Sequence, residues 1–275
     1  MKYKTTSFFV YTRVRYLSCM QQAVQAFGVL VSINVIRYFV IAGLAFVLFY
    51  FVFAQKMVRN KIQQRKASRK ELLREVLHSL QTTLVLAAVG VLILFTPLRQ
   101  YTLVYDAADA YAWWWLPVSV FLSLVVHDTY FYWMHRALRH KVVFKYTHLV
   151  HHKSTNPSPW ASYSFHFFEA CTEGAVLLLL VFVLPMNAAG IGLFVLIGFI
   201  INVYGHLGYE IMPRWFRHSL LFEVVNTSVY HNMHHSKFKG NYGLYFRIWD
   251  RLLKTEHPDY VKEYDRIQAT RFPIV

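Results

Sequence analysis

Histidines occur in three groups whose spacing is typical of metal ligands. Two of these groups share the spacing i, i+3, i+4. One consists of His148, His151 and His152, and the other consists of His231, His234 and His235. On a helix this spacing places three imidazoles on one face. His135 and His140 form a third pair, which can converge if the helix ends between them. Because a neutral imidazole is a good ligand for iron, zinc, copper or nickel, the pattern predicts a metal site without choosing the metal.

The number of histidines predicts two ions rather than one. The three groups supply eight imidazoles, and a single ion takes about four to six ligands. A histidine beside a membrane segment can serve only as a polar contact to lipid head groups, but two copies of the same spacing favour the metal site. Soluble di-iron bundles use Glu together with Glu-x-x-His, whereas residues 135–152 contain no acid.

The elements that must position these histidines are membrane helices. Hydrophobic residues make up 56% of the 275 residues, more than is usual in a soluble domain. The stretches that we expect to span the bilayer are residues 35–54, 80–95 and 113–132. Residues 174–205 contain no charged residue or histidine, but they are too long for one span and too short for two. The interruption at Pro185 predicts a hairpin of two short helices there.

We therefore predict an all-α, multi-pass membrane bundle of about three full spans plus an apolar helical hairpin. A histidine-rich helical cap on the cytoplasmic side completes this fold, and residues 1–275 form a single membrane domain. Residues 1–25 lack the apolar core of a cleaved signal peptide and are expected to form an interfacial helix.

Charge predicts the orientation of the bundle. Residues 56–74 hold eight Lys or Arg against a single acid, which is typical of a cytoplasmic loop. Counting spans from this loop returns the chain to the cytoplasmic side at His135, so the histidine groups are expected to face the cytoplasm. The membrane would be the inner membrane in a bacterium and the endoplasmic reticulum in a eukaryote. The net charge of +15 fits anionic lipid head groups, and no nucleic-acid-binding motif is present.

Several motifs resemble those of the fatty acid hydroxylase and sterol desaturase superfamily of membrane oxygenases. The matching sequences are HRALRH at residues 135–140, THLVHH ending at His152, HNMHH at residues 231–235 and NYGLYFRIWDRL at residues 241–252. The resemblance covers roughly residues 113–255, which would form the catalytic region. Also similar are the segment KSTNPSPWASYSFHFFEA after the second group and GHLGYE at residues 205–210.

This resemblance implies a membrane enzyme that hydroxylates or desaturates a lipid such as a fatty acyl chain or a sterol. It implies two iron ions held by histidines and dioxygen as the oxidant. An all-histidine ligand set would leave the irons electrophilic enough to attack an unactivated C–H bond. The electrons would come from a separate donor, either a b-type cytochrome or a ferredoxin with its reductase, because the chain has no haem-binding or flavin-binding motif.

The resemblance also assigns roles to residues outside the three groups. His206 in GHLGYE resembles a ligand position, and Asn202 stands where fatty acid hydroxylases of the family carry a further histidine. His166 and Glu169 resemble a motif of the sterol branch. His127 and Asp128 are ionisable residues inside an apolar span, where such groups are functional by default. We expect Asn202, His166, Glu169 and Asp128 to support the ligands, and we expect His127 either to support a ligand or to bind the metal itself.

Two other classes of protein compete with the oxygenase. A histidine-rich metal transporter or metal-binding membrane protein would place its ionisable residues near the bilayer midplane between repeats, whereas these histidines lie outside the apolar stretches and no internal repeat is visible. A membrane zinc hydrolase would need a motif such as H-E-x-x-H, which the sequence lacks. The sequence leaves the substrate, the choice between hydroxylation and desaturation, and the oligomeric state open.

Overall fold

The protein is all-helical, as the sequence predicts. The computed structural model describes residues 3–107 and 109–273, with side chains from Met20 onward. The α-helices are α1 (Tyr3–Val47), α2 (Arg69–Leu94), α3 (Trp115–Leu138), α4 (Leu149–His152), α5 (Phe167–Val183), α6 (Ala188–Gly205), α7 (Leu220–Val224), α8 (Ser228–Lys237), α9 (Ile248–Leu252) and α10 (Tyr260–Arg271). These described parts of the chain contain no β-strand.

Among the described residues, three helices are long and apolar enough to cross a membrane. They are Met20–Val52, which joins α1 to a short π-helical turn, and then α2 and α6. Only 17% of the apolar window in the first of these is buried within the protein, so lipid must cover most of its side chains. The apolar helix begins before residue 35, and most of the predicted span at residues 35–54 lies within it.

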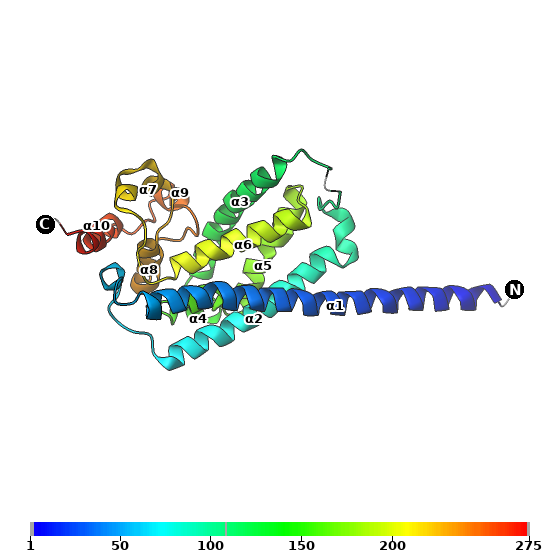
Figure 1. Ribbon diagram of the computed structural model, residues 1–275. Coiled ribbons are helices and arrows are strands. Elements are labelled where there is room, and N and C mark those ends of the chain that lie inside the picture. Colours follow the sequence, from blue (N-terminus) through cyan, green and yellow to red (C-terminus); the bar gives the residue numbers. More distant parts are fainter. Residues whose placement is uncertain (1–2, 108, 274–275) are drawn as a thin grey trace.

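Helix α1 is longer than a bilayer requires. Its 45 residues extend about 68 Å at 1.5 Å per residue, against a hydrocarbon thickness of about 30 Å. Figure 1 shows its N-terminal part running beyond the other helices. Residues 1–2 lie outside the described residues, and from Tyr3 no break separates the predicted interfacial segment from the span.

Helix α3 occupies the place of the predicted third span but extends further, to Leu138. Its 24 residues are long enough to cross about 30 Å of hydrocarbon. It carries polar residues, among them His127, Asp128 and His135, and it is not one of the three candidate spans named above. These three side chains are buried, so α3 turns its polar face toward the protein interior.

Helices α5 and α6 form the predicted hairpin. Helix α5 ends at Val183 and α6 begins at Ala188, on either side of the predicted interruption at Pro185. The side chain of Asn187 caps α6 by accepting a hydrogen bond from the backbone N–H of Gly190 at 2.8 Å. The hairpin brings Glu169, near the start of α5, and His206, just after α6, back to the end of the bundle that holds the histidines.

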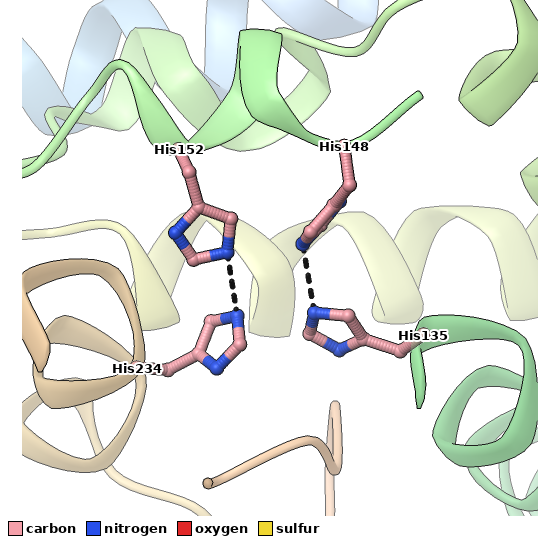
Figure 2. A group of neighbouring side chains, drawn as sticks. All are labelled: His135, His148, His152 and His234. Atoms are coloured by element: carbon pink, nitrogen blue, oxygen red, sulfur yellow. Dashed lines mark hydrogen bonds between the residues drawn. The ribbon is translucent and has the colours of Figure 1, made fainter. Parts of the chain in front are cut away.

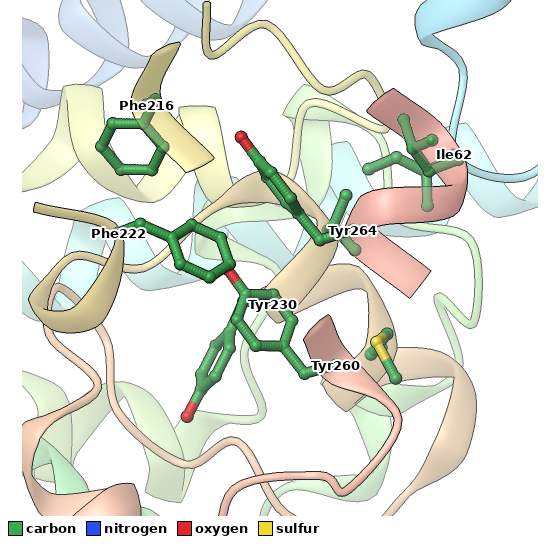
Figure 3. Close-up of a cluster of buried hydrophobic side chains, with 9 residues drawn as sticks. Ile62, Phe216, Phe222, Tyr230, Tyr260 and Tyr264 are labelled. Atoms are coloured by element: carbon green, nitrogen blue, oxygen red, sulfur yellow. The ribbon is translucent and has the colours of Figure 1, made fainter. Parts of the chain in front are cut away.

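The C-terminal part of the chain, residues 206–273, packs as a cap on this end of the bundle, where Figure 1 shows α7 to α10 gathered. Its core contains Ile62, Phe216, Phe222, Val229, Tyr230, Met233, Tyr260, Tyr264 and Ile267. Figure 3 shows the rings of Phe222, Tyr230, Tyr260 and Tyr264 gathered in this core. Arg247 is buried against it and pairs with Glu256 at 2.8 Å. This packing fixes α8, which carries three of the histidines.

Candidate metal centre

Eight buried histidines meet where the cap joins the bundle and form two groups of four. The first group is His135, His148, His152 and His234, and the second group is His151, His206, His231 and His235. Within each group the candidate ligand nitrogens all lie within 4.8 Å of one another. Figure 2 shows the imidazoles of the first group pointing toward a common centre from three segments of the chain. The groups are adjacent, because the ring centroids of His152 and His235 are 4.9 Å apart.

Each H-x-x-H-H sequence supplies ligands to both groups. In the first sequence, His148 and His152 belong to the first group and His151 belongs to the second. In the other sequence, His231 and His235 belong to the second group and His234 belongs to the first. Residues four apart share a helix face, whereas successive residues diverge by about 100°. The expected common face of three imidazoles is therefore split between two neighbouring centres.

Five of the eight rings are held through Nδ1. In the first group, His135 donates to the carbonyl oxygen of Tyr242 at 2.9 Å and His234 donates to that of Gly240 at 2.8 Å. His148 donates to the carboxylate of Glu169. In the second group the acceptors are the carbonyl oxygens of Asn202 for His206 at 2.8 Å and of Ser154 for His235 at 3.0 Å. A carbonyl oxygen only accepts, so Nδ1 carries the proton and leaves the Nε2 lone pair free.

The convergence of these lone pairs fits a bound cation. In the first group the Nε2 atoms of His135 and His148 are 2.8 Å apart. Since Nδ1 of each ring is already the donor, two acceptor atoms of neutral rings face each other, which is repulsive unless a cation lies between them. The Nε2 atoms of His152 and His234 are 2.9 Å apart. A metal ion that prefers imidazole nitrogen, such as iron or zinc, suits this set of donors.

The second group has the same character with slightly wider spacing. Nε2 of His206 lies 3.4 Å from Nε2 of His151 and 3.1 Å from Nε2 of His231. Nε2 of His235 lies 3.1 Å from that of His231. His206, the residue after α6, thus joins the two histidine sequences, in the position that the resemblance assigned to it.

Burial keeps the imidazoles neutral. Burial, which disfavours the charged ring, lowers the pKa values of six of them well below the usual 6.5. Neighbouring rings lower these values further, as does the charge of Arg139 for His152 and His234. The six are His148, His151, His152, His231, His234 and His235. Neutral imidazole is the form that binds metal, so these rings are ready to act as ligands at neutral pH.

Arg139 lies against the first group. Its Nη1 atom is 2.7 Å from Nε2 of His152, and its Nη2 atom donates to the carbonyl oxygen of Phe238. The guanidinium also lies over the rings of Phe144 and Tyr242, at 5.3 and 5.9 Å from their centroids. A guanidinium and a metal ion need the same lone pair of His152, so the two groups are chemically unequal. The described residues place no such cation against the second group.

Two predicted site residues lie apart from both groups. His140, predicted as a ligand, is exposed, because α3 ends at Leu138 and the following turn directs the residue outward. His166, predicted to support a ligand, instead caps α5 by accepting a hydrogen bond from the backbone N–H of Phe168 at 3.3 Å. Neither position suits the role that the sequence suggested.

None of the contacts described for His127 and Asp128 reaches a histidine of either group directly. Nδ1 of His127 lies 2.9 Å from the hydroxyl of Tyr245, not against a histidine of either group. The carboxylate of Asp128 accepts hydrogen bonds from the backbone N–H groups of Leu244, Tyr245 and Phe246 at 2.7–3.1 Å. Asp128 therefore fixes the loop just after Tyr242, whose carbonyl oxygen holds His135.

Glu169 and Asn202 do contact histidines of the groups. Glu169 accepts the proton of His148 Nδ1, so it orients one ring of the first group. Asn202 holds His206 through its backbone carbonyl, while its side-chain N–H donates to the carbonyl oxygen of Ser162 at 2.8 Å. A support role for both residues is consistent with these contacts.

An apolar cavity of about 400 Å³ opens onto the second group. His151, His206 and His231 form part of its wall, residues of α1, α2, α3, α5 and α6 form most of the remainder, and Tyr163, Phe165, Leu244 and Tyr245 complete it. Cavities of this size commonly bind small molecules. A lipid chain or ring system in the cavity would therefore lie next to the second group and away from Arg139.

The sequence analysis missed three polar residues at this centre. Glu173 and Tyr245 line the cavity, and Arg139 lies against His152. Glu173 carried a usable signal, because it is an acid directly before the uncharged stretch 174–205 and one helical turn after Glu169. Arg139 and Tyr245 carried none, because their contacts depend on how distant segments pack.

Comparison with known proteins places this centre in a family. The family model described as fatty acid hydroxylase matches residues 120–255. The chain is 28% identical over 231 residues to lathosterol oxidase of Rattus norvegicus. These residues make up 83% of this chain and 74% of that protein.

Two fungal relatives are also similar. A Delta(7)-sterol 5(6)-desaturase of Gibberella zeae is 34% identical over 149 residues, 54% of this chain and 44% of that protein. A probable Delta(7)-sterol 5(6)-desaturase of Neurospora crassa is 29% identical over 235 residues, 84% of this chain and 63% of that protein. The chain thus spans less than two thirds of the length of these two relatives. No solved structure matches it.

The matched residues 120–255 contain all eight histidines of the two groups. Three apolar helices long enough to cross a membrane accompany them. The matched relatives are named as oxidases and desaturases. The chain belongs to the fatty acid hydroxylase and sterol desaturase superfamily.

Proposed function

We propose that this protein binds two iron ions, one in each histidine group, and uses dioxygen to hydroxylate or desaturate a lipid. The observation that carries the proposal is the pair of adjacent four-histidine groups, the second of which forms part of the wall of an apolar cavity. The names of the relatives favour a sterol, although a fatty acyl chain remains an alternative substrate. Residues 113–255 would form the catalytic region within a single membrane domain.

In this proposal the histidines hold the metal and the cavity wall holds the lipid. The eight histidines hold the metal, and the carbonyl oxygens of Tyr242, Gly240, Ser154 and Asn202 fix the direction of four rings. Bound iron, supplied with electrons and dioxygen, provides the oxidising power to remove hydrogen from an unactivated carbon. The cavity wall holds the lipid beside the second group and keeps bulk water away from the reacting carbon.

The histidine groups face the cytoplasm in this proposal. The basic segment 56–74 supports it, because the segment packs against the cap: Ile62 enters the cap core, and Gln63 donates to the side chain of Asn232 at 2.7 Å. A loop this basic is retained on the cytoplasmic side. An external electron donor, a b-type cytochrome or a ferredoxin with its reductase, would then reach the cap from the cytoplasm. The membrane would be the endoplasmic reticulum in a eukaryote or the inner membrane in a bacterium.

The decisive experiment combines metal analysis with lipid chemistry on the full-length protein purified from membranes. Elemental analysis should find two irons per chain, and the reduced protein should consume dioxygen. Mass spectrometry of lipids from a host with and without the gene should show a lipid that gains one oxygen or loses two hydrogens. One zinc per chain with no consumption of dioxygen would refute the proposal in favour of a zinc enzyme, and metal uptake into vesicles without lipid oxidation would favour a transporter.

A matched pair of variants tests the assignment of ligands. His231→Ala removes a ring of the second group and should abolish lipid oxidation and lower the metal content by about one ion per chain. His140→Ala removes an exposed histidine that touches neither group and should leave the metal content unchanged. Equal loss of metal in the two variants would refute the division into two groups of four.

A further inference from the structure

His127, Glu173 and Tyr245 form a polar corner of the apolar cavity, whose wall also carries a second polar cluster of Arg37 with Asn34 and Tyr163. His127 comes from α3, Glu173 from α5 and Tyr245 from the loop before α9. His127 is 9% exposed, and the side chain of Glu173 is 11% exposed. None of the contacts described for these three residues reaches a histidine of either metal group, so the corner is a separate feature of the cavity.

The polar atoms of this corner are incompletely paired. Nδ1 of His127 lies 2.9 Å from the hydroxyl of Tyr245. Nε2 of His127 lies 3.7 Å from Oε2 of Glu173, too far for a direct hydrogen bond. Both Nε2 of His127 and Oε1 of Glu173 are buried without a hydrogen-bonding partner. Buried polar groups are nearly always paired, so atoms left unpaired in a cavity indicate a place for a polar group of a ligand.

Gly198 shows that the position of the tyrosine hydroxyl is closely fitted. A Cβ atom at Gly198 would lie 2.5 Å from the hydroxyl oxygen of Tyr245. The absence of a side chain on α6 at this point lets the hydroxyl reach His127. The corner therefore depends on a specific packing of α3, α6 and the loop that carries Tyr245.

We propose that this corner binds a hydroxyl group on an otherwise apolar lipid, so that the substrate of the enzyme is a lipid alcohol. When Tyr245 donates to Nδ1 of His127, Nε2 carries a proton and points toward the gap before Glu173. A hydroxyl offers one donor and two acceptor positions. It can accept from Nε2 of His127 and donate to the carboxylate of Glu173, which pairs the atoms that are otherwise unpaired.

Other head groups suit the corner less well. A carboxylate would bring a second negative charge beside Glu173, and a plain hydrocarbon would leave both polar atoms unpaired. A site built to hydrogen-bond a hydroxyl discriminates strongly against an analogue that lacks it. The hydroxyl could belong to a sterol or to a long-chain alcohol, which share this chemistry and differ in the shape of the apolar body.

This inference rests on the proposed lipid-oxidising function but can be tested without it, by measuring the binding of lipids to the full-length protein. Native mass spectrometry in detergent would give the dissociation constants of cholesterol and its analogue lacking the hydroxyl, and of octadecanol and octadecane. Each alcohol that fits should bind at least tenfold more tightly than its hydrocarbon counterpart. A preference confined to one pair identifies a sterol or a long-chain alcohol as the natural class. Equal binding within both pairs would overturn the proposal, and this comparison needs no variant.

Variants then assign the preference to the corner. Glu173→Leu should reduce the ratio of alcohol to hydrocarbon affinity to about one, whereas Glu173→Gln, which keeps an acceptor oxygen, should retain part of it. Leu177→Met, a volume-conserving change in the same cavity wall one turn further along α5, should shift both affinities together and leave the ratio unchanged. An unchanged ratio in Glu173→Leu would overturn the assignment.

The outcomes for the corner and for the proposed function remain separate. A protein that oxidises lipids but binds alcohols and hydrocarbons equally lacks the hydroxyl site and keeps the proposed function. A protein that prefers alcohols but binds no redox-active metal keeps the hydroxyl site and loses the proposed function. The binding ratio is a property that a merely structural role of Glu173 would not change.

Discussion

Nη1 of Arg139 lies 2.7 Å from Nε2 of His152, so a guanidinium is bonded to the lone pair that a metal ion in the first group requires. The contact makes the first group the weaker of two otherwise similar sites. A positive charge close to the site opposes a second positive charge there, with a repulsion of about 4 kcal/mol for unit charges about 4 Å apart at an effective dielectric constant of about 20.

Replacing this arginine should therefore strengthen metal binding. In Arg139→Gln we expect the affinity of the first group to rise at least tenfold, measured as metal per chain against free metal concentration. The control is Arg136→Gln, because Arg136 is exposed, donates to the hydroxyl of Tyr132 at 3.2 Å and is not bonded to a histidine. Metal binding that is unchanged in Arg139→Gln, or weaker than in Arg136→Gln, would contradict the competition for His152.

Glu169 should set the metal affinity through His148. Its carboxylate fixes the proton on Nδ1 of His148, and loss of such a partner commonly costs about 10–100-fold in metal affinity. We expect Glu169→Gln to weaken the first group by this amount, measured by metal titration. Glu173→Gln is the matched control, because Glu173 lies one turn further along α5 and is directed toward His127. Equal metal affinity in the two variants would refute the role of Glu169.

The metal-free protein should lose stability in acid, starting near pH 6.5. The folded-state pKa values of His148, His151, His152 and their partners on α8 lie well below 6.5 because the rings are buried. Their contribution to stability is complete above pH 6.5 and is lost as the pH falls, because the unfolded chain takes up protons that the folded chain cannot. Each such histidine contributes about 1.4 kcal/mol per pH unit.

The measurement is the thermal midpoint of metal-free protein in detergent between pH 5 and pH 8. Wild type and His140→Gln should show the same steep fall, because His140 is exposed. His235→Gln should show a shallower fall, because one buried ring fewer remains to be protonated on unfolding. A midpoint that does not depend on pH in this range would show that the rings are accessible to protons in the folded state.

Gly240 should be intolerant of a side chain. Its φ of +74° is in the left-handed region, and a Cβ atom would lie 2.5 Å from the carbonyl oxygen of Thr255. Gly240→Ala should therefore cost about 1–3 kcal/mol of stability, and it should weaken metal binding because the Gly240 carbonyl holds His234. Gly28→Ala is the control: nothing lies within 4 Å of a Cβ there, so no loss of stability is expected. A normal thermal midpoint in Gly240→Ala would contradict the prediction.

The sequence by itself determined the helical membrane fold, the hairpin and the eight histidines of the two groups, but it also predicted His140 as a ligand, which is exposed. Apolar stretches of about 20 residues favour membrane helices, because a helix satisfies its backbone N–H and C=O groups internally where the bilayer offers them no partner. The interruption at Pro185 separates α5 from α6 as predicted. The repeated i, i+3, i+4 spacing identified the histidines because imidazole chemistry is local to each residue.

Only the tertiary structure decided how these residues combine. It divided each H-x-x-H-H sequence between two centres, left His140 and His166 outside both, and brought Arg139 onto His152 and His127 onto Tyr245. These contacts join residues that are 13 to more than 100 positions apart, and they depend on how the cap packs on the bundle. Local spacing specifies which way a side chain leaves its helix, whereas its partner across the fold is set by packing that no single segment encodes.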